Sequence, residues 1–98
     1  MLIHSVFFWN KPASSAEDAA FLAGLQGLLA IPDIQQGFVG PPAATRDAVI
    51  DHSYDFGLTL LFADQAAHDR YQVDPRHLAF IKQFEYRFAK VRVFDMEG

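Results

Sequence analysis

The chain has 98 residues and a formal net charge of −4, from 12 acidic and 8 basic side chains. This length suits one domain, so we expect a single domain over residues 1–98. The acidic balance argues against nucleic-acid binding, which depends on basic neutralisation of phosphates. The lack of cysteine excludes disulfides and a cysteine nucleophile. No apolar run approaches the ~18 residues of a membrane span, so a cytoplasmic protein is expected.

Hydrophobic residues make up 51% of the chain and aromatic residues 14%, with ten phenylalanines. A small domain has much surface relative to its volume, so an apolar-rich small domain is expected to bury part of its apolar surface against a partner. The composition therefore indicates an oligomer or an apolar pocket.

The first predicted element is a strand over residues 2–9, because β-branched and aromatic side chains dominate there and Pro12 follows. Apolar residues occupy both faces of this strand. One layer of helices covers one side of a sheet, so another surface must cover the second side.

A capping box, Ser14-x-x-Glu17, predicts a helix over residues ~15–30, in which leucines and Phe21 recur at helical spacing. A short strand over 35–40 is expected next, followed by a polar, alanine-rich loop from 41 to 51.

A strand is predicted over 54–62, where large apolar residues share one parity. Asp64 is an expected N-cap, and Asp74 with Pro75 is expected to start a second helix after a break near Val73. At helical spacing, the members of one apolar face of the second helix are His77, Ile81, Phe84 and Phe88.

A last strand over 91–95 completes the order β-α-β-β-α-β. We therefore predict an α+β, ferredoxin-like fold, with a four-stranded antiparallel sheet and helices on one face. The doubly apolar first strand is explained if two sheets pack back to back, so that a homodimer forms an α/β barrel.

Three polar side chains occupy positions where apolar ones are expected: His4, Tyr71 and His77. A buried polar group must find a hydrogen-bond partner, and histidine is readily tuned for proton transfer near neutral pH. The three could therefore act together on a carbonyl compound in an apolar cleft. The alternative is that all three are satisfied core groups without a chemical role.

Other patterns are weaker. Asp51, His52 and Ser53 have the residue types of a hydrolase triad, but three adjacent residues do not normally adopt its geometry. His68 and Asp69 lie on a predicted helix without a second histidine four residues away. A helical pair of metal ligands is thus missing, and the chain also has no glycine-rich phosphate motif. We therefore expect neither a metal site nor a cofactor.

Four segments carry a resemblance that spans nearly the whole chain. They are I-H-S-V-F-F-W followed by Lys11, then D-F-G-L-T-L-L-F-A-D, Y-Q-V-D-P-R-H-L-A-F and V-R-V-F-D. With them the chain resembles the stress-responsive α/β-barrel domain family of the dimeric ferredoxin-like superfamily. The resemblance implies a homodimer with a cavity between the helices and sheet of each subunit.

One plant branch of that family resembles cofactor-free polyketide cyclases. Their site pairs a helix histidine with a tyrosine six residues earlier, the spacing of His77 and Tyr71, and His4 matches a further pocket histidine. The resemblance implies a catalytic set of His77, Tyr71 and His4.

Three functions follow as hypotheses. The cavity carries out acid/base chemistry on an apolar carbonyl substrate; or it holds an apolar small-molecule ligand without turnover, as a stress-associated binding module; or the protein is a structural dimer.

Overall fold

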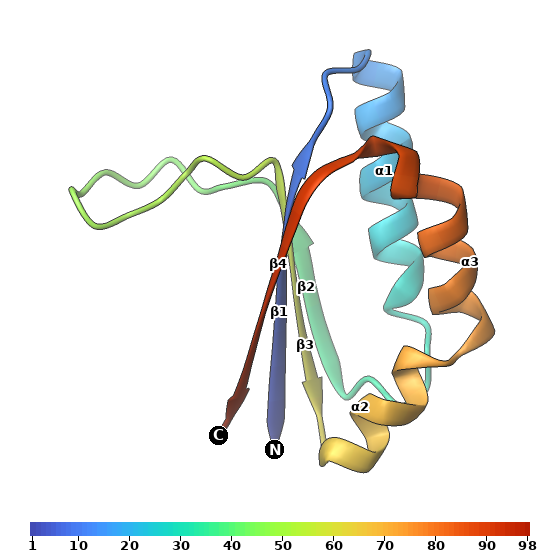
Figure 1. Cartoon of the computed structure of the whole chain (residues 1–98). Coiled ribbons are helices and arrows are strands. Elements are labelled where there is room, and N and C mark those ends of the chain that lie inside the picture. Colours follow the sequence, from blue (N-terminus) through green and yellow to red (C-terminus); the bar gives the residue numbers. More distant parts are fainter.

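A four-stranded antiparallel sheet with all its helices on one face forms the body of the protein, seen edge-on in Figure 1. The computed structural model describes all 98 residues. In chain order the elements are β1 (Leu2–Asn10), α1 (Ser15–Leu28), β2 (Gln36–Gly40), β3 (Phe56–Phe62), α2 (Gln65–Gln72), α3 (Pro75–Phe84), the 3₁₀ turn η1 (Glu85–Arg87) and β4 (Phe88–Glu97). The strand order β2-β3-β1-β4 confirms the predicted ferredoxin-like fold.

β1 is a central strand that pairs with β3 on one side and β4 on the other. Val6 lies opposite Leu58 of β3 and Val93 of β4, so these three side chains share a face. His4 and Phe8 lie on the same face, under the helices, and each is 3% exposed. Alternate residues of β1 therefore face the helices, and His4 is among them.

The residue before each α-helix has a side chain that accepts a hydrogen bond from a backbone N–H of the first turn, which has no carbonyl partner within the helix. Ser14 and Glu17 form the predicted capping box at α1, and Asp64 accepts a hydrogen bond from the Ala67 N–H at α2. α1 ends at Leu28, two residues before its predicted end. No helix of the protein is both long enough and apolar enough to span a membrane.

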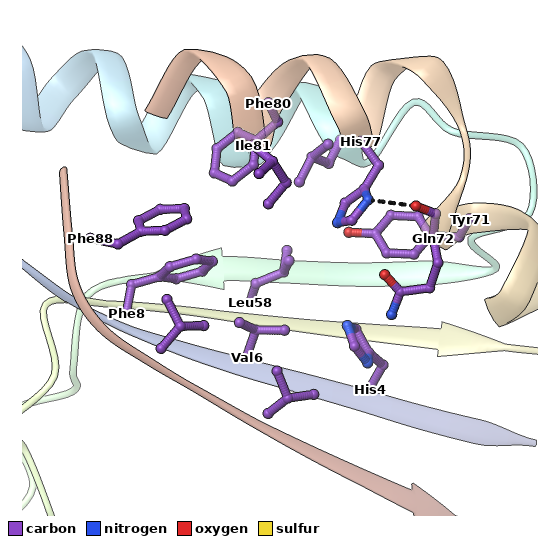
Figure 2. Close-up of a pocket in the computed structure, with 13 residues that line it drawn as sticks. His4, Val6, Phe8, Leu58, Tyr71, Gln72, His77, Phe80, Ile81 and Phe88 are labelled. Carbon is purple, nitrogen blue, oxygen red and sulfur yellow. Dashed lines mark hydrogen bonds between the residues drawn. The ribbon is translucent and has the colours of Figure 1, made fainter. Parts of the chain in front are cut away.

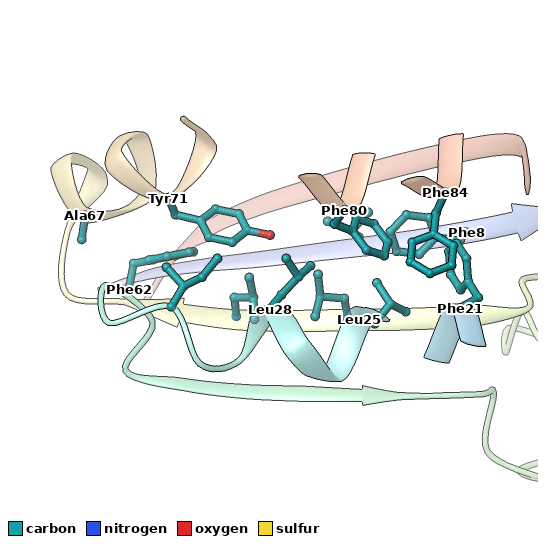
Figure 3. Close-up of a cluster of buried hydrophobic side chains, with 13 residues drawn as sticks. Phe8, Phe21, Leu25, Leu28, Phe62, Ala67, Tyr71, Phe80 and Phe84 are labelled. Carbon is teal, nitrogen blue, oxygen red and sulfur yellow. The ribbon is translucent and has the colours of Figure 1, made fainter. Parts of the chain in front are cut away.

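Aromatic rings make up a large part of the core between the helices and the sheet, together with leucines and other aliphatic side chains (Figure 3). Phe21 of α1 is fully buried, and its ring lies 5.3 Å from that of Phe8 and 5.4 Å from that of Phe84. Edge-to-face contacts of this kind add stability beyond the buried apolar area. The high phenylalanine content is thus largely used inside one subunit.

One prediction was wrong at the end of α3. The helix stops at Phe84, and Phe88 begins β4 instead of continuing the helix face of His77. Backbone pairing explains the difference, because Phe88 lies opposite Asn10 in the sheet and the Arg87 carbonyl accepts from the Lys11 N–H at 2.7 Å. These partners replace the intrahelical hydrogen bonds that a longer helix would have made.

The other face of the sheet has no helix over it. Phe7 and Trp9 of β1 lie there beside Phe94 and Met96 of β4, and both β4 side chains are exposed. The loop between β2 and β3 projects on this side, away from the helices (Figure 1). We call this surface the open face.

Two glycines of α1 provide a matched test of how closely the helices pack. A Cβ atom on Gly24 would come within 2.4 Å of the Phe84 ring, whereas one on Gly27 would meet nothing within 4 Å. Gly24→Ala should therefore lower the free energy of unfolding by about 1–3 kcal/mol through overpacking. Gly27→Ala should raise it by about 0.5 kcal/mol, since alanine is the better helix former. Urea denaturation of both variants measures this, and equal effects would contradict the packing.

Candidate active site

A cavity of about 210 Å³ lies between the helices and the core-facing side of the sheet (Figure 2). Its walls are largely hydrophobic, and its polar side chains gather at one end. Val91 and Val93 of β4 are exposed and form its rim toward solvent. The lining residues are His4, Val6, Phe8, Leu28, Leu58, Tyr71, Gln72, His77, Phe80, Ile81, Phe88, Val91 and Val93.

The break between α2 and α3 orients His77. In a continuous helix the Gln72 carbonyl would accept from the Arg76 N–H. Here the Asp74 carboxylate accepts a hydrogen bond from the Arg76 N–H at 2.8 Å. The Gln72 carbonyl is left free and accepts a hydrogen bond from His77 Nδ1 at 3.1 Å. The same Arg76 contacts hold the pKa of the Asp74 carboxyl below its usual value. The predicted cap, Asp74, therefore also leaves the Gln72 carbonyl free to bind His77.

The tautomer of His77 follows from this contact. A carbonyl oxygen can only accept, so Nδ1 carries the hydrogen and Nε2 of the neutral ring keeps a free lone pair. Burial lowers the pKa of His77 below 6.5, although the hydrogen bond to Gln72 partly opposes this. His77 is thus neutral at pH 7, with one nitrogen able to accept a proton.

Tyr71 lies against His77, with 4.6 Å between the ring centroids. It comes from the last turn of α2 and is 1% exposed, and its hydroxyl is directed toward the cavity in Figure 2. Burial raises the pKa of this hydroxyl well above 10. Tyr71 therefore stays protonated and can donate a hydrogen bond to an oxygen atom placed in the cavity.

His4 reaches the same end of the cavity from the sheet. Its Nδ1 lies 2.6 Å from Oδ1 of Asp95, the residue directly opposite on β4, and its ring is 6.0 Å from that of Tyr71. Burial lowers the pKa of His4, and the Asp95 carboxylate partly offsets the effect. The structure thus brings together His4, Tyr71 and His77, the three side chains singled out in the sequence.

Two further polar residues of this cluster, Asp95 and Gln72, were missed in the sequence, and they join it to His68 and Asp69, which the sequence had indicated only as a weak pattern. Asp95 pairs with His4, and the Gln72 side-chain amide lies 3.0 Å from Nε2 of His68. His68 Nδ1 is in turn 3.1 Å from Asp69. Gln72 therefore connects two histidines, one through its side chain and one through its carbonyl. The four-residue spacing of His68 and Gln72 was the only available signal, since it places them on one helix face.

A set of possible metal ligands also lies here. His4, His68 and Asp95 each offer one ligand atom, and these atoms lie within 4.8 Å of one another. They come from β1, α2 and β4, so no sequence spacing indicated them.

The loop residues Asp51, His52 and Ser53 do not form a triad. The Asp51 carboxylate accepts from the Ser53 backbone N–H, and the Ser53 hydroxyl accepts from the Trp9 indole at 3.0 Å. His52 instead contacts the backbone carbonyl of Thr45. None of the three lines the cavity.

Comparison with known proteins places the chain among domains of this fold. The family model described as the stress responsive A/B barrel domain matches residues 2–98. Among curated protein sequences, none matches. A Dabb family protein with a ferredoxin-like fold from Mesorhizobium loti is 32% identical, with a TM-score of 0.82, covering 99% of this chain and 95% of that one.

Two more distant structures show the same fold. A dimeric ferredoxin-like protein of unknown function from Thermobifida fusca is 19% identical, with a TM-score of 0.81 and coverage of 99% of this chain and 90% of that one. A hydroxynitrile lyase from Passiflora edulis is 21% identical, with a TM-score of 0.79 and coverage of 97% and 90%.

The burial of His77 predicts a lowered imidazole pKa, which a titration can measure. In the unfolded chain this imidazole takes up a proton near pH 6.5, and in the folded chain only at lower pH. Its contribution to stability is therefore complete above pH 6.5 and decreases as the pH falls below that value. An NMR titration of the ring protons, assigned with His77→Ala, should give a pKa below 6.5. A pKa at or above 6.5 would show that the ring is not desolvated.

Proposed function

Because this chain belongs to the family of stress-responsive A/B barrel domains, we propose that it is a dimeric small-molecule-binding protein whose cavity carries out acid/base chemistry on an apolar carbonyl compound. The observation that carries the proposal is the contact between Tyr71 and His77 at the polar end of an otherwise apolar cavity. The hydroxynitrile lyase of the same fold from Passiflora edulis supports an enzymatic use of such a scaffold.

The proposed step is removal of a proton from the carbon next to a carbonyl group. His77 Nε2 accepts this proton, the C–H bond breaks, and the electron pair moves to the carbonyl oxygen to form an enolate. The Tyr71 hydroxyl donates a hydrogen bond to that oxygen as negative charge develops on it. Return of the proton from His77, to the same carbon or to a product, closes the cycle without a cofactor.

Burial suits each group to its role. The lowered pKa of His77 keeps the base unprotonated at pH 7, and the raised pKa of Tyr71 keeps the donor protonated. His4, held by Asp95, contributes a second neutral imidazole that orients the substrate. A hydrogen bond to a developing oxyanion is also stronger in a site that excludes water.

The size of the cavity limits the substrate. An engineered apolar cavity of about 150 Å³ binds benzene. The cavity here, at about 210 Å³, therefore suits one ring or a short alkyl chain that carries a carbonyl group. Phe8, Phe80 and Phe88 line its walls and favour the apolar part of such a compound.

Dimerisation is proposed to occur through the open face. Its exposed side chains, Phe94 and Met96 among them, lie together on a sheet surface that no helix covers. Neighbours of this fold from Thermobifida fusca and Jannaschia are described as dimeric. Two such faces packed against each other account for the apolar residues on both sides of β1.

Deuterium exchange tests the chemistry without knowledge of the natural substrate. Methyl ketones with one ring or a medium-length chain, such as acetophenone, are incubated with the protein in D₂O and followed by NMR. His77→Ala should slow the catalysed exchange by about 100-fold or more, since the base is lost. Tyr71→Phe should slow it by about 100-fold through loss of the oxyanion donor.

His52→Ala is the matched control, because His52 lies in the β2–β3 loop outside the cavity. Its exchange rate should equal that of the wild type. Ketone binding without any exchange would contradict catalysis and favour the alternative of a ligand-binding module. Unfolding of His77→Ala would identify that histidine as structural.

Native mass spectrometry tests the dimer. The wild type should appear at twice the 11.0 kDa chain mass. Phe94→Glu, which places a charge on the open face, should shift it to the monomer, since a buried unpaired charge is costly. Leu78→Glu is the control, because Leu78 is an exposed apolar residue of α3 on the helical layer. Loss of the dimer in both variants, or in neither, would contradict the assigned face.

A further inference from the structure

His4, His68 and Asp95 lie at the junction of three elements, where β1, β4 and α2 meet beside the cavity. Their ligand atoms are within 4.8 Å of one another, and the His4 and His68 rings are 4.9 Å apart with a tilt of 58°. We propose that these three side chains form a binding site for a divalent transition-metal ion of the zinc class.

The ligand types fit such an ion. Imidazole nitrogen and carboxylate oxygen bind zinc, cobalt and nickel, whereas magnesium and calcium prefer oxygen alone. Two histidines and one carboxylate leave a fourth position of a tetrahedral ion for water. The Asp95 side chain is 45% exposed, so this position and the route to it open toward solvent.

His68 already has the arrangement of a metal ligand. Its Nδ1 faces the Asp69 carboxylate at 3.1 Å, so Nδ1 carries the hydrogen and Nε2 carries the lone pair. A carboxylate behind a histidine fixes the ring and raises its basicity in many zinc sites. At present Nε2 accepts from the Gln72 side chain, which an arriving ion would displace.

The His4–Asp95 pair needs one local change. Nδ1 of His4 now donates to Asp95 at 2.6 Å. Ligation through Nδ1 moves the ring hydrogen to Nε2, so the imidazole stays neutral and the ion replaces the shared hydrogen. Around a tetrahedral ion with bonds of about 2.0–2.2 Å, ligand atoms lie about 3.4 Å from one another. His4 Nδ1 and Asp95 Oδ1 must therefore separate from 2.6 Å, whereas the more distant ligand atoms of the set, up to 4.8 Å apart, must approach.

The local charge favours a doubly positive ion. Asp95 and Asp69 are two carboxylates within the cluster, and together they balance a charge of +2. The nearest basic residue in the sequence, Arg70, is occupied elsewhere by an ion pair with Asp33 at 3.1 Å. Metal binding at this cluster does not depend on the proposed catalytic activity.

Isothermal titration of tag-free, metal-depleted protein with ZnCl₂ tests the site. The wild type should bind one ion per chain. His68→Ala should weaken binding by more than about 100-fold, because loss of an outer partner alone costs about 10–100-fold. Asp69→Asn, which removes only that outer partner, should fall within the smaller range. The Asp69 side chain is 61% exposed, whereas that of His68 is 12% exposed, so circular dichroism first checks that His68→Ala keeps the wild-type fold.

One control separates this site from other histidines. His52→Ala should bind Zn²⁺ as the wild type does, because His52 does not belong to the ligand set. The visible spectrum of added Co²⁺ should change in the wild type and in His52→Ala but not in His68→Ala. Absence of binding at one equivalent, unchanged binding by His68→Ala, or loss of binding in His52→Ala would each overturn the proposal.

Discussion

The interruption of the helical layer between α2 and α3 is the constraint on which the site depends. Asp74 accepts the Arg76 N–H and Pro75 has no N–H to donate, so no backbone group reaches the Gln72 carbonyl in the helical manner. That carbonyl is left to His77. One capping residue therefore ends one helix, starts the next and fixes which nitrogen of the cavity histidine keeps its lone pair.

Desolvation shifts the pKa values of the neighbouring His77 and Tyr71 side chains in opposite directions. Removing water disfavours the charged form of each group, so the pKa of His77 falls while that of Tyr71 rises. A neutral base and a protonated donor result from the same physical cause at one end of one cavity. The apolar walls matter for this reason as well as for binding, since they provide the low-dielectric surroundings.

The side chains of the central strand β1 lie alternately on the two faces of the sheet. The core-facing residues of β1 include His4, which meets Asp95 across the β1–β4 pairing, and His68 approaches it from α2. The residues that alternate with the core-facing ones along β1, such as Phe7, lie on the open face. No helix packs on this face (Figure 1). A shift of one residue in register would exchange the two sets, so strand pairing decides both the polar cluster and the exposed apolar surface.

The sequence by itself determined the element order, the three helix N-caps and the positions of the three polar residues on core-facing sides. These features are local, because they follow from spacing along one strand or one helix. Tyr71 and His77 are close in the sequence, so their proximity is also a local feature, although the break between α2 and α3 separates them. The extent of α3 was not predictable in this way, because the backbone at Phe88 is paired with β1, far away in the chain.

The tertiary structure alone decided which partners those side chains have. Asp95 lies 91 residues from His4 in the chain, and only the antiparallel register of β4 places the two in contact. The cluster with His68 likewise requires α2 to pack over β1. Side-chain periodicity tells which face a residue occupies, whereas contact between faces depends on packing and register, which no single segment specifies.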